Sequence, residues 1–288
     1  MTKNSFTNAT APEPHFSAAA QPLAPDTVIH TTSEGLHCGA VQIDCAGFAL
    51  PAYRAMPKGI SKPPMVLVVP EIFGLHAHIA DVTRRLAHQG FMAIAPDVMA
   101  REGDASAHSD MATLMAEVVS KVPDAQVLQD LDTVVDWAGQ QGGDLERLGI
   151  TGFCWGGRMT WLYATHQPRV KAGVAWYGRL AGNKTALTPA HPVDATHDLQ
   201  APVLGLYGAL DTGIPLDTVA AMRAALKEGS ASARASRIEV YADAPHAFYA
   251  DYRPGYRHAA AQAAWGEMLA WFAAHGVAPH APYPKESA

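Results

Sequence analysis

The chain has 288 residues, of which 49% are apolar and 17% charged, and its formal net charge is −6 at pH 7. This length and composition predict one large globular domain and argue against a disordered chain. The negative charge argues against nucleic acid as a partner, because a phosphate-binding surface normally carries a basic excess. The longest apolar run in a strand-like stretch, Met65–Val69, is too short to cross a bilayer.

The first 25 residues are rich in Ser, Thr, Ala, Asn and Pro, without an apolar run behind a basic start. We therefore expect a flexible arm over residues 1–25, no secretory signal, and a single domain over residues 26–280. The three cysteines, Cys38, Cys45 and Cys154, contain no CxxC pair. This pattern predicts neither a disulfide framework nor a zinc site, and it favours a cytoplasmic location.

The rest of the chain is typical of an α/β fold. Residues 27–56 alternate loosely and contain several Gly and Pro residues, which predicts short antiparallel strands at a sheet edge. Buried strands and amphipathic helices then alternate, in the order strand Met65–Val69, helix His78–His88, strand Phe91–Ala95, helix Val127–Ala138, strand Leu148–Thr151, helix Arg158–His166, strand Val170–Trp176, strand Pro202–Tyr207, helix Leu216–Leu226, strand Ile238–Tyr241 and helix Ala259–His275. Such alternation predicts a doubly wound, mostly parallel sheet with its functional site at the carboxyl ends of the strands. The aperiodic stretch Ala181–Gln200 is predicted to be a long loop at the edge of the sheet.

The segment Gly152-Phe-Cys-Trp-Gly156 lies between a predicted strand and a predicted helix. This is the setting of a G-x-S-x-G nucleophile elbow, with Cys154 in the serine position. Glycines are needed there because a Cβ would collide with backbone at the sharp turn from strand to helix. The helix N-terminus favours a thiolate, so we expect Cys154 to be a nucleophile. The alternative is a buried structural cysteine in a glycine-rich turn.

A cysteine nucleophile needs a base, and the base needs a residue that orients it. In α/β-hydrolases the chain order is nucleophile, acid, histidine. Asp211 follows one predicted strand and His246 follows the next, so both should reach the same sheet end. Asp243 is the rival orienting acid, but it lies too close to His246 in sequence to be preferred.

Backbone amides are expected to bind the oxyanion, and we select those of Trp155 and Ile72. Trp155 directly follows the nucleophile, and Ile72 lies in the loop after the strand Met65–Val69. His76 and His78 suggest a metal pair, but no third ligand accompanies them at helical spacing. Without a Walker A or G-x-G-x-x-G motif, we expect neither a metal nor an organic cofactor.

Five segments, in this order, resemble the dienelactone hydrolase family (carboxymethylenebutenolidases), and the resemblance extends over residues 30–275. They are Pro70–Gly74, Ala95–Arg101, Gly152–Gly157, Tyr207–Asp211 and Pro245–Phe248. The resemblance implies an α/β-hydrolase fold and a glutamate, here Glu71, that contacts the resting thiol. On substrate binding that glutamate moves and takes the thiol proton.

The resemblance also implies arginines that hold the carboxylate of a lactone substrate. Arg101 matches the first by motif, whereas the position of the second, four residues after the histidine, is Ala250. Arg253 follows closely and is the candidate replacement, since a guanidinium binds a carboxylate with two hydrogen bonds. Phe73 and Tyr249 are candidate pocket-lining residues, although core packing explains aromatic side chains equally well.

These observations predict a hydrolase that cleaves a small, anionic enol-lactone or ester through a Cys154 thioester, acting as a monomer or small homo-oligomer. One alternative is another cysteine-type esterase, thioesterase or peptidase on the same fold, which a substrate panel would separate. A second is a binding protein without turnover. Thiol labelling at Cys154 without ester hydrolysis would favour it.

Overall fold

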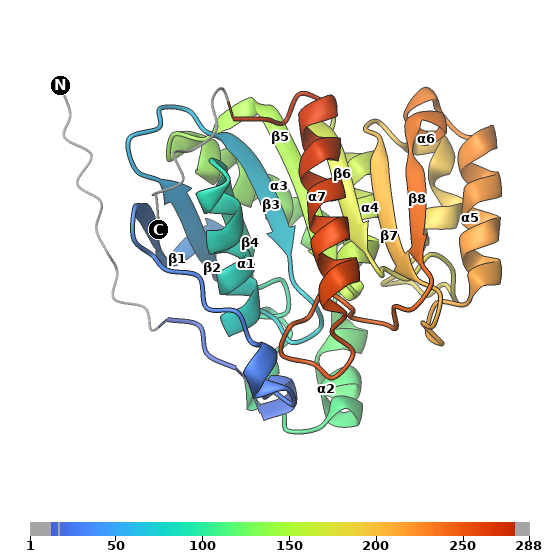
Figure 1. Cartoon of the computed structure of the whole chain (residues 1–288), viewed down its shortest axis with the longest axis horizontal. Coiled ribbons are helices and arrows are strands. Elements are labelled where there is room, and N and C mark those ends of the chain that lie inside the picture. The colour runs from blue at the N-terminus through green and yellow to red at the C-terminus, as the bar shows by residue number, and fades with distance from the viewer. Residues whose placement is uncertain (1–12, 17, 280–288) are drawn as a thin grey trace.

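The computed structural model describes residues 13–16 and 18–279, and it contains one eight-stranded mixed sheet (Figure 1). The strand order is β1-β2-β4-β3-β5-β6-β7-β8. β2 is antiparallel to both β1 and β4, and all later neighbours are parallel. The strands are β1 (Leu36–Cys45), β2 (Phe48–Pro57), β3 (Pro64–Val69), β4 (Met92–Pro96), β5 (Asp144–Phe153), β6 (Val170–Trp176), β7 (Val203–Gly208) and β8 (Arg237–Tyr241).

Helices cover both faces of this sheet. Figure 1 shows α1 (Ala77–His88) and α7 (His258–Ala274) on one face, with α3 (Asp124–Gln140) and α4 (Trp155–His166) on the other. The remaining helices are α2 (Met111–Glu117), α5 (Leu216–Glu228) and α6 (Ala231–Ala235), with 3-10 turns at Ala18–Ala20, Pro25–Thr27, Ala105–Ala107, Val119–Lys121, Pro192–Asp194 and Thr196–Asp198. The predicted α/β-hydrolase fold is confirmed, and each element predicted after residue 64 overlaps an observed element of its kind.

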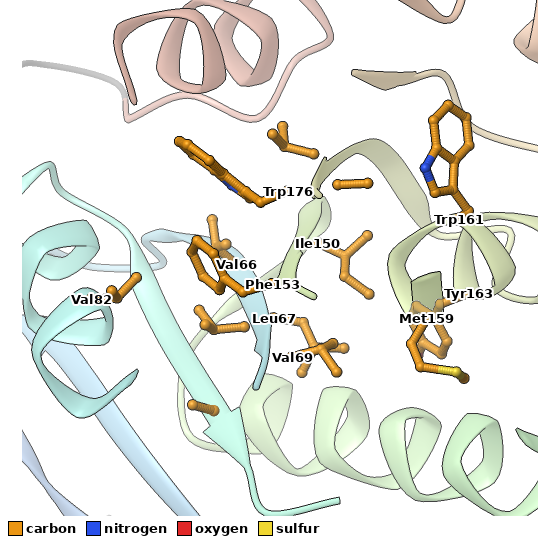
Figure 2. Packing of buried hydrophobic residues seen from close by; sticks show 14 of the residues in the cluster. Val66, Leu67, Val69, Val82, Ile150, Phe153, Met159, Trp161, Tyr163 and Trp176 are labelled. Carbon is orange, nitrogen blue, oxygen red and sulfur yellow. The ribbon is translucent and has the colours of Figure 1, made fainter. Parts of the chain in front are cut away.

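The central strands are buried on both faces, as their continuous apolar sequences predict. All six residues of β3 are buried. Figure 2 shows Val66 of β3, Phe153 of β5 and Trp176 of β6 packed in one cluster, with Val82 of α1 nearby. This core fixes the strand ends from which the candidate site is built.

Two regions at the N-terminal end differ from the prediction. β1 and β2 form one hairpin of two ten-residue strands, longer than expected, whose turn at Ala46 and Gly47 has φ of 54° and 84°. The described part of the predicted arm packs on the domain, because Ala20 is buried and the Leu23 amide donates to the Tyr252 carbonyl. Residues 1–12 and 17 lie outside the described residues. Within residues 13–16 and 18–279, no helix is both long and apolar enough to cross a membrane.

Candidate active site

The Cys154 elbow forms at the junction of β5 and α4. Cys154 has φ of 53° and ψ of −114°, a conformation that projects its side chain from a sharp turn. A Cβ on Gly152 would lie 2.2 Å from the Gly156 carbonyl oxygen, and one on Gly156 would lie 2.2 Å from that of Val69. Both glycines are therefore required by close backbone approach. The close approach of Gly156 to Val69 also brings the elbow next to the loop that follows β3.

Asp211 and His246 meet although 35 residues separate them. β7 and β8 are parallel neighbours, and the Leu210 amide donates to the Ala244 carbonyl, which joins the loops beyond the two strands. The Oδ2 atom of Asp211 lies 2.6 Å from Nδ1 of His246, while its Oδ1 accepts from the amides of Gly213 and Ile214. The Asp211 carboxylate is thus fixed by the protein and in turn orients the imidazole. Asp243, the rival acid, is exposed.

The imidazole of His246 is hydrogen-bonded to Asp211 and lies beside Cys154. Burial alone would lower the pKa of His246, but Asp211, Cys154 and their negative charges raise it to about 10. A protonated imidazole next to a cysteine is the setting in which a cysteine nucleophile is activated. The His246 side chain is 40% exposed, so water reaches the imidazole.

Glu71, predicted to contact the resting thiol, has a hydrogen-bond partner that the sequence did not predict. Its Oε2 lies 2.9 Å from Nε2 of His76, and both side chains are almost fully buried. The left-handed Gly74 (φ 66°) permits the tight turn that returns the chain from Glu71 to His76. Burial, the largest single effect, opposes ionisation of Glu71, but the hydrogen bond from His76 and the nearby positive charges together outweigh it and lower the carboxyl pKa.

His76 itself remains neutral at pH 7, because burial and the charges of His78 and Arg253 together lower its pKa although Glu71 raises it. Nε2 of His76 must then carry the proton, since the ionised Glu71 can only accept. The neighbouring His78 bonds Asp251 through Nδ1 at 3.2 Å. Each histidine of the pair that suggested a metal is therefore bonded to its own carboxylate.

The two arginines considered for a substrate carboxylate occupy different surroundings. Arg101 binds both oxygens of Asp130 and the carbonyl of Cys45, so its guanidinium already has protein partners. A substrate carboxylate would have to compete with Asp130, which departs from the expectation for a binding arginine. Arg253 lies over the rings of Phe73 and Tyr252, at 4.8 and 4.9 Å, and donates one hydrogen bond to the Ala19 carbonyl.

Arg253 also lies close to the catalytic groups. Its charge acts on Glu71 and His76, and the buried Tyr252 is influenced by Glu71, Arg253 and Cys154 together. The buried Ala250 occupies the position of the family's second arginine, and the Arg253 amide donates to the Ala250 carbonyl one turn later. This turn places Arg253 beside the site.

Comparison with known proteins identifies the family. A model of the dienelactone hydrolase family matches residues 50–276. The chain belongs to the dienelactone hydrolase family. A Salmonella typhimurium protein named "Putative carboxymethylenebutenolidase" is 54% identical over 262 residues, which cover 91% of this chain and 96% of the relative.

Two further relatives span most of the chain. The crystal structure of a "Putative Dienelactone Hydrolase" from Klebsiella pneumoniae has a TM-score of 0.80 and 55% identity, covering 83% of this chain and 98% of that one. A Bradyrhizobium protein named "Probable 2-oxo-3-(5-oxofuran-2-ylidene)propanoate lactonase" is 32% identical over 237 residues, covering 82% of this chain and 93% of the relative. This dienelactone hydrolase-family chain is accordingly a carboxylic ester hydrolase.

Of the remaining residues predicted for the site, some lie beside it and one packs in the core. Trp155 is the first residue of α4, where an amide has no intrahelical acceptor, and Ile72 lies in the turn next to the elbow. Phe73 packs under Arg253 beside His76. Tyr249, in contrast, packs against Trp176 at 4.5 Å, and Arg85 of α1 binds its hydroxyl.

Three residues around the site have contacts that the sequence did not predict. His76 holds Glu71, and Tyr177 lies edge-on to His246 with 5.2 Å between ring centroids. Phe16, from the predicted arm, packs on His76 and Tyr252 at 5.8 and 5.2 Å. A signal existed for Tyr177, which directly follows a strand at its carboxyl end. No pattern in the sequence marks Phe16.

Proposed function

We propose that this protein hydrolyses a small anionic lactone or ester through a thioester on Cys154. One observation supports the mechanism above all: the His246 imidazole is hydrogen-bonded to Asp211 at 2.6 Å and has its pKa raised by the adjacent Cys154. Ser, Cys and Thr nucleophiles activated by an oriented histidine use this arrangement.

In the first half of the reaction the Cys154 thiolate forms a bond to the substrate carbonyl carbon. The amides of Trp155 and Ile72 bind the resulting oxyanion. When the tetrahedral intermediate collapses, the C–O bond breaks and the imidazolium of His246 gives its proton to the leaving enolate or alkoxide oxygen. The product of this half is a neutral His246 and an acylated Cys154.

In the second half, neutral His246 removes a proton from a water molecule that attacks the thioester. The acid is released as the C–S bond breaks, and the thiolate–imidazolium pair is restored. The exposed part of His246 supports access for this water. Asp211 holds the imidazole in one orientation through both halves.

Arg253 is the residue that we assign to an anionic group on the substrate. Its guanidinium lies over the rings of Phe73 and Tyr252 and donates to the Ala19 carbonyl. A charged carboxylate is a stronger acceptor than a carbonyl and can replace it. The name of the Bradyrhizobium relative describes a lactone that carries a carboxylate, which supports this substrate class.

The nucleophile is tested by substitution and mass spectrometry. Cys154→Ala should abolish hydrolysis of an anionic lactone while circular dichroism remains that of the wild type, and Cys154→Ser should be weak because a hydroxyl needs a stronger base. In His246→Ala acylation should be slow, because the thiol loses its base, but an acyl adduct that forms on Cys154 should persist since no base activates water. Turnover at the wild-type rate in Cys154→Ala would refute the assignment.

A further inference from the structure

Tyr177 occupies the position next to the nucleophile in the sheet. Trp176 pairs with Phe153 in register, so Tyr177 and Cys154 are each the first residue beyond two neighbouring parallel strands. The Cys154 amide donates to the Trp176 carbonyl at 3.0 Å. With its ring edge-on to His246, Tyr177 lies beside both the proposed nucleophile and the proposed base.

The backbone of Tyr177 is held in a strained conformation. Among the described residues, five that are not glycine have left-handed φ, and three of them are at or next to the site, namely Cys154 (53°), Tyr177 (37°) and Ala247 (58°). The Tyr177 amide donates to the Leu206 carbonyl at 2.8 Å. A Cβ on the following Gly178 would lie 2.3 Å from the Gly157 backbone. Such strain persists where surrounding structure fixes it, commonly at functional sites.

The Tyr177 hydroxyl is buried and has no hydrogen-bond partner within the part of the chain that the structure describes. A buried donor without an acceptor destabilises a fold, so most are paired. The titratable groups that act on this hydroxyl are Glu71, Tyr252, Cys154 and Tyr249. Burial first, and then the charge of Glu71, raises the pKa of Tyr177 well above its usual value. The hydroxyl therefore stays protonated and acts as a donor, not as a base.

We propose that the Tyr177 hydroxyl is a catalytic hydrogen-bond donor to a substrate oxygen that gains negative charge in the transition state. This inference rests on the proposed function of Cys154. Because the hydroxyl makes no hydrogen bond to a described residue of the free protein, it breaks none when substrate binds, and its donor is oriented in advance. Tyr177 transfers no proton, since His246 supplies the proton of the leaving group.

The test is Tyr177→Phe, which removes one oxygen atom and retains the ring against His246. We expect kcat for an anionic lactone to fall about 10- to 100-fold, with KM changed less than about 2-fold. The melting temperature should not fall, because the lost hydroxyl had no described partner. Labelling of Cys154 by iodoacetamide should keep the wild-type rate, since the thiolate–imidazolium pair remains.

Tyr163→Phe is the matched control, because the buried Tyr163 hydroxyl donates to Asp132 at 2.9 Å and Tyr163 lies within α4. It should lower the melting temperature and leave kcat unchanged. Wild-type kcat in Tyr177→Phe would overturn the inference. A loss of kcat accompanied by a lower melting temperature would also overturn it, since the role would then be structural. Activity in Cys154→Ala would instead refute the proposed nucleophile, so the two failures are distinguishable.

Discussion

The carboxylate of Glu71 lies 2.9 Å from Nε2 of His76, on the loop that also supplies the Ile72 amide. This hydrogen bond favours the ionised form of the buried Glu71, so one carboxylate oxygen already has a partner in the free protein. His246 is the group whose pKa is raised by Cys154. The arrangement therefore favours ionisation of the thiol by His246 before substrate arrives.

The first prediction concerns the thiol of the free enzyme. Iodoacetamide should label Cys154 rapidly at pH 7, and Glu71→Gln should change that rate less than about 3-fold, because His246 alone forms the ion pair. His246→Ala should slow labelling until the pH approaches the ordinary cysteine pKa of about 8.5. Slow labelling that an anionic ligand accelerates, with the acceleration lost in Glu71→Gln, would instead support the family's glutamate movement.

The second prediction concerns alkaline pH. The imidazolium of His246 is the proposed proton donor to the leaving group, and its pKa is raised to about 10. Because a raised pKa keeps the charged form present at higher pH, kcat/KM should remain level at neutral pH and fall as the pH rises through about 10. Asp211→Asn removes a hydrogen bond and a charge that raise this pKa, so the decline should begin at lower pH and kcat should fall. An unchanged alkaline limb in Asp211→Asn would contradict this assignment.

The third prediction separates the two arginines. Arg253→Ala should raise KM for an anionic lactone about 10-fold or more, with a much smaller effect on a neutral aryl ester, because only the anion loses a charge-assisted contact. Arg101→Ala is the comparison, since it should leave KM for both substrates near the wild-type value. It should lower stability, as Asp130 is only 4% exposed and would lose its main partner. The reverse pattern of KM changes would assign the substrate carboxylate to Arg101.

The fourth prediction concerns the long loop between β6 and β7. Arg158 of α4 binds both carboxylate oxygens of Asp124 and also the Ala190 carbonyl, so this buried pair anchors the loop. Asp124→Ala should destabilise the protein by about 3–5 kcal/mol in urea, because it leaves a buried charge unpaired. Asp136→Ala, which breaks the exposed pair with Arg169, should cost less than about 1 kcal/mol. Similar losses for both variants would show that burial of the Arg158 pair contributes little.

The sequence by itself determined the alternation of strands and helices and the elbow at Cys154. Both features depend on residues that are close in sequence. Apolar periodicity is a property of neighbouring residues, and the turn from Gly152 to Gly156 needs its glycines whatever the rest of the fold. The sequence also predicts that Cys154, Asp211 and His246 lie close together, since the loops that follow parallel strands lie at one edge of a sheet.

Only the tertiary structure decided which partner each polar side chain has. Arg101 follows the expected motif, yet Asp130 of α3 binds its guanidinium from 29 residues away. Glu71 bonds His76, and Phe16 of the predicted arm packs on His76. The Tyr177 hydroxyl, which has no hydrogen-bond partner among the described residues, likewise depends on what surrounds it after folding. Such pairings depend on distances between segments remote in sequence, and periodicity and motif spacing carry no information about those distances.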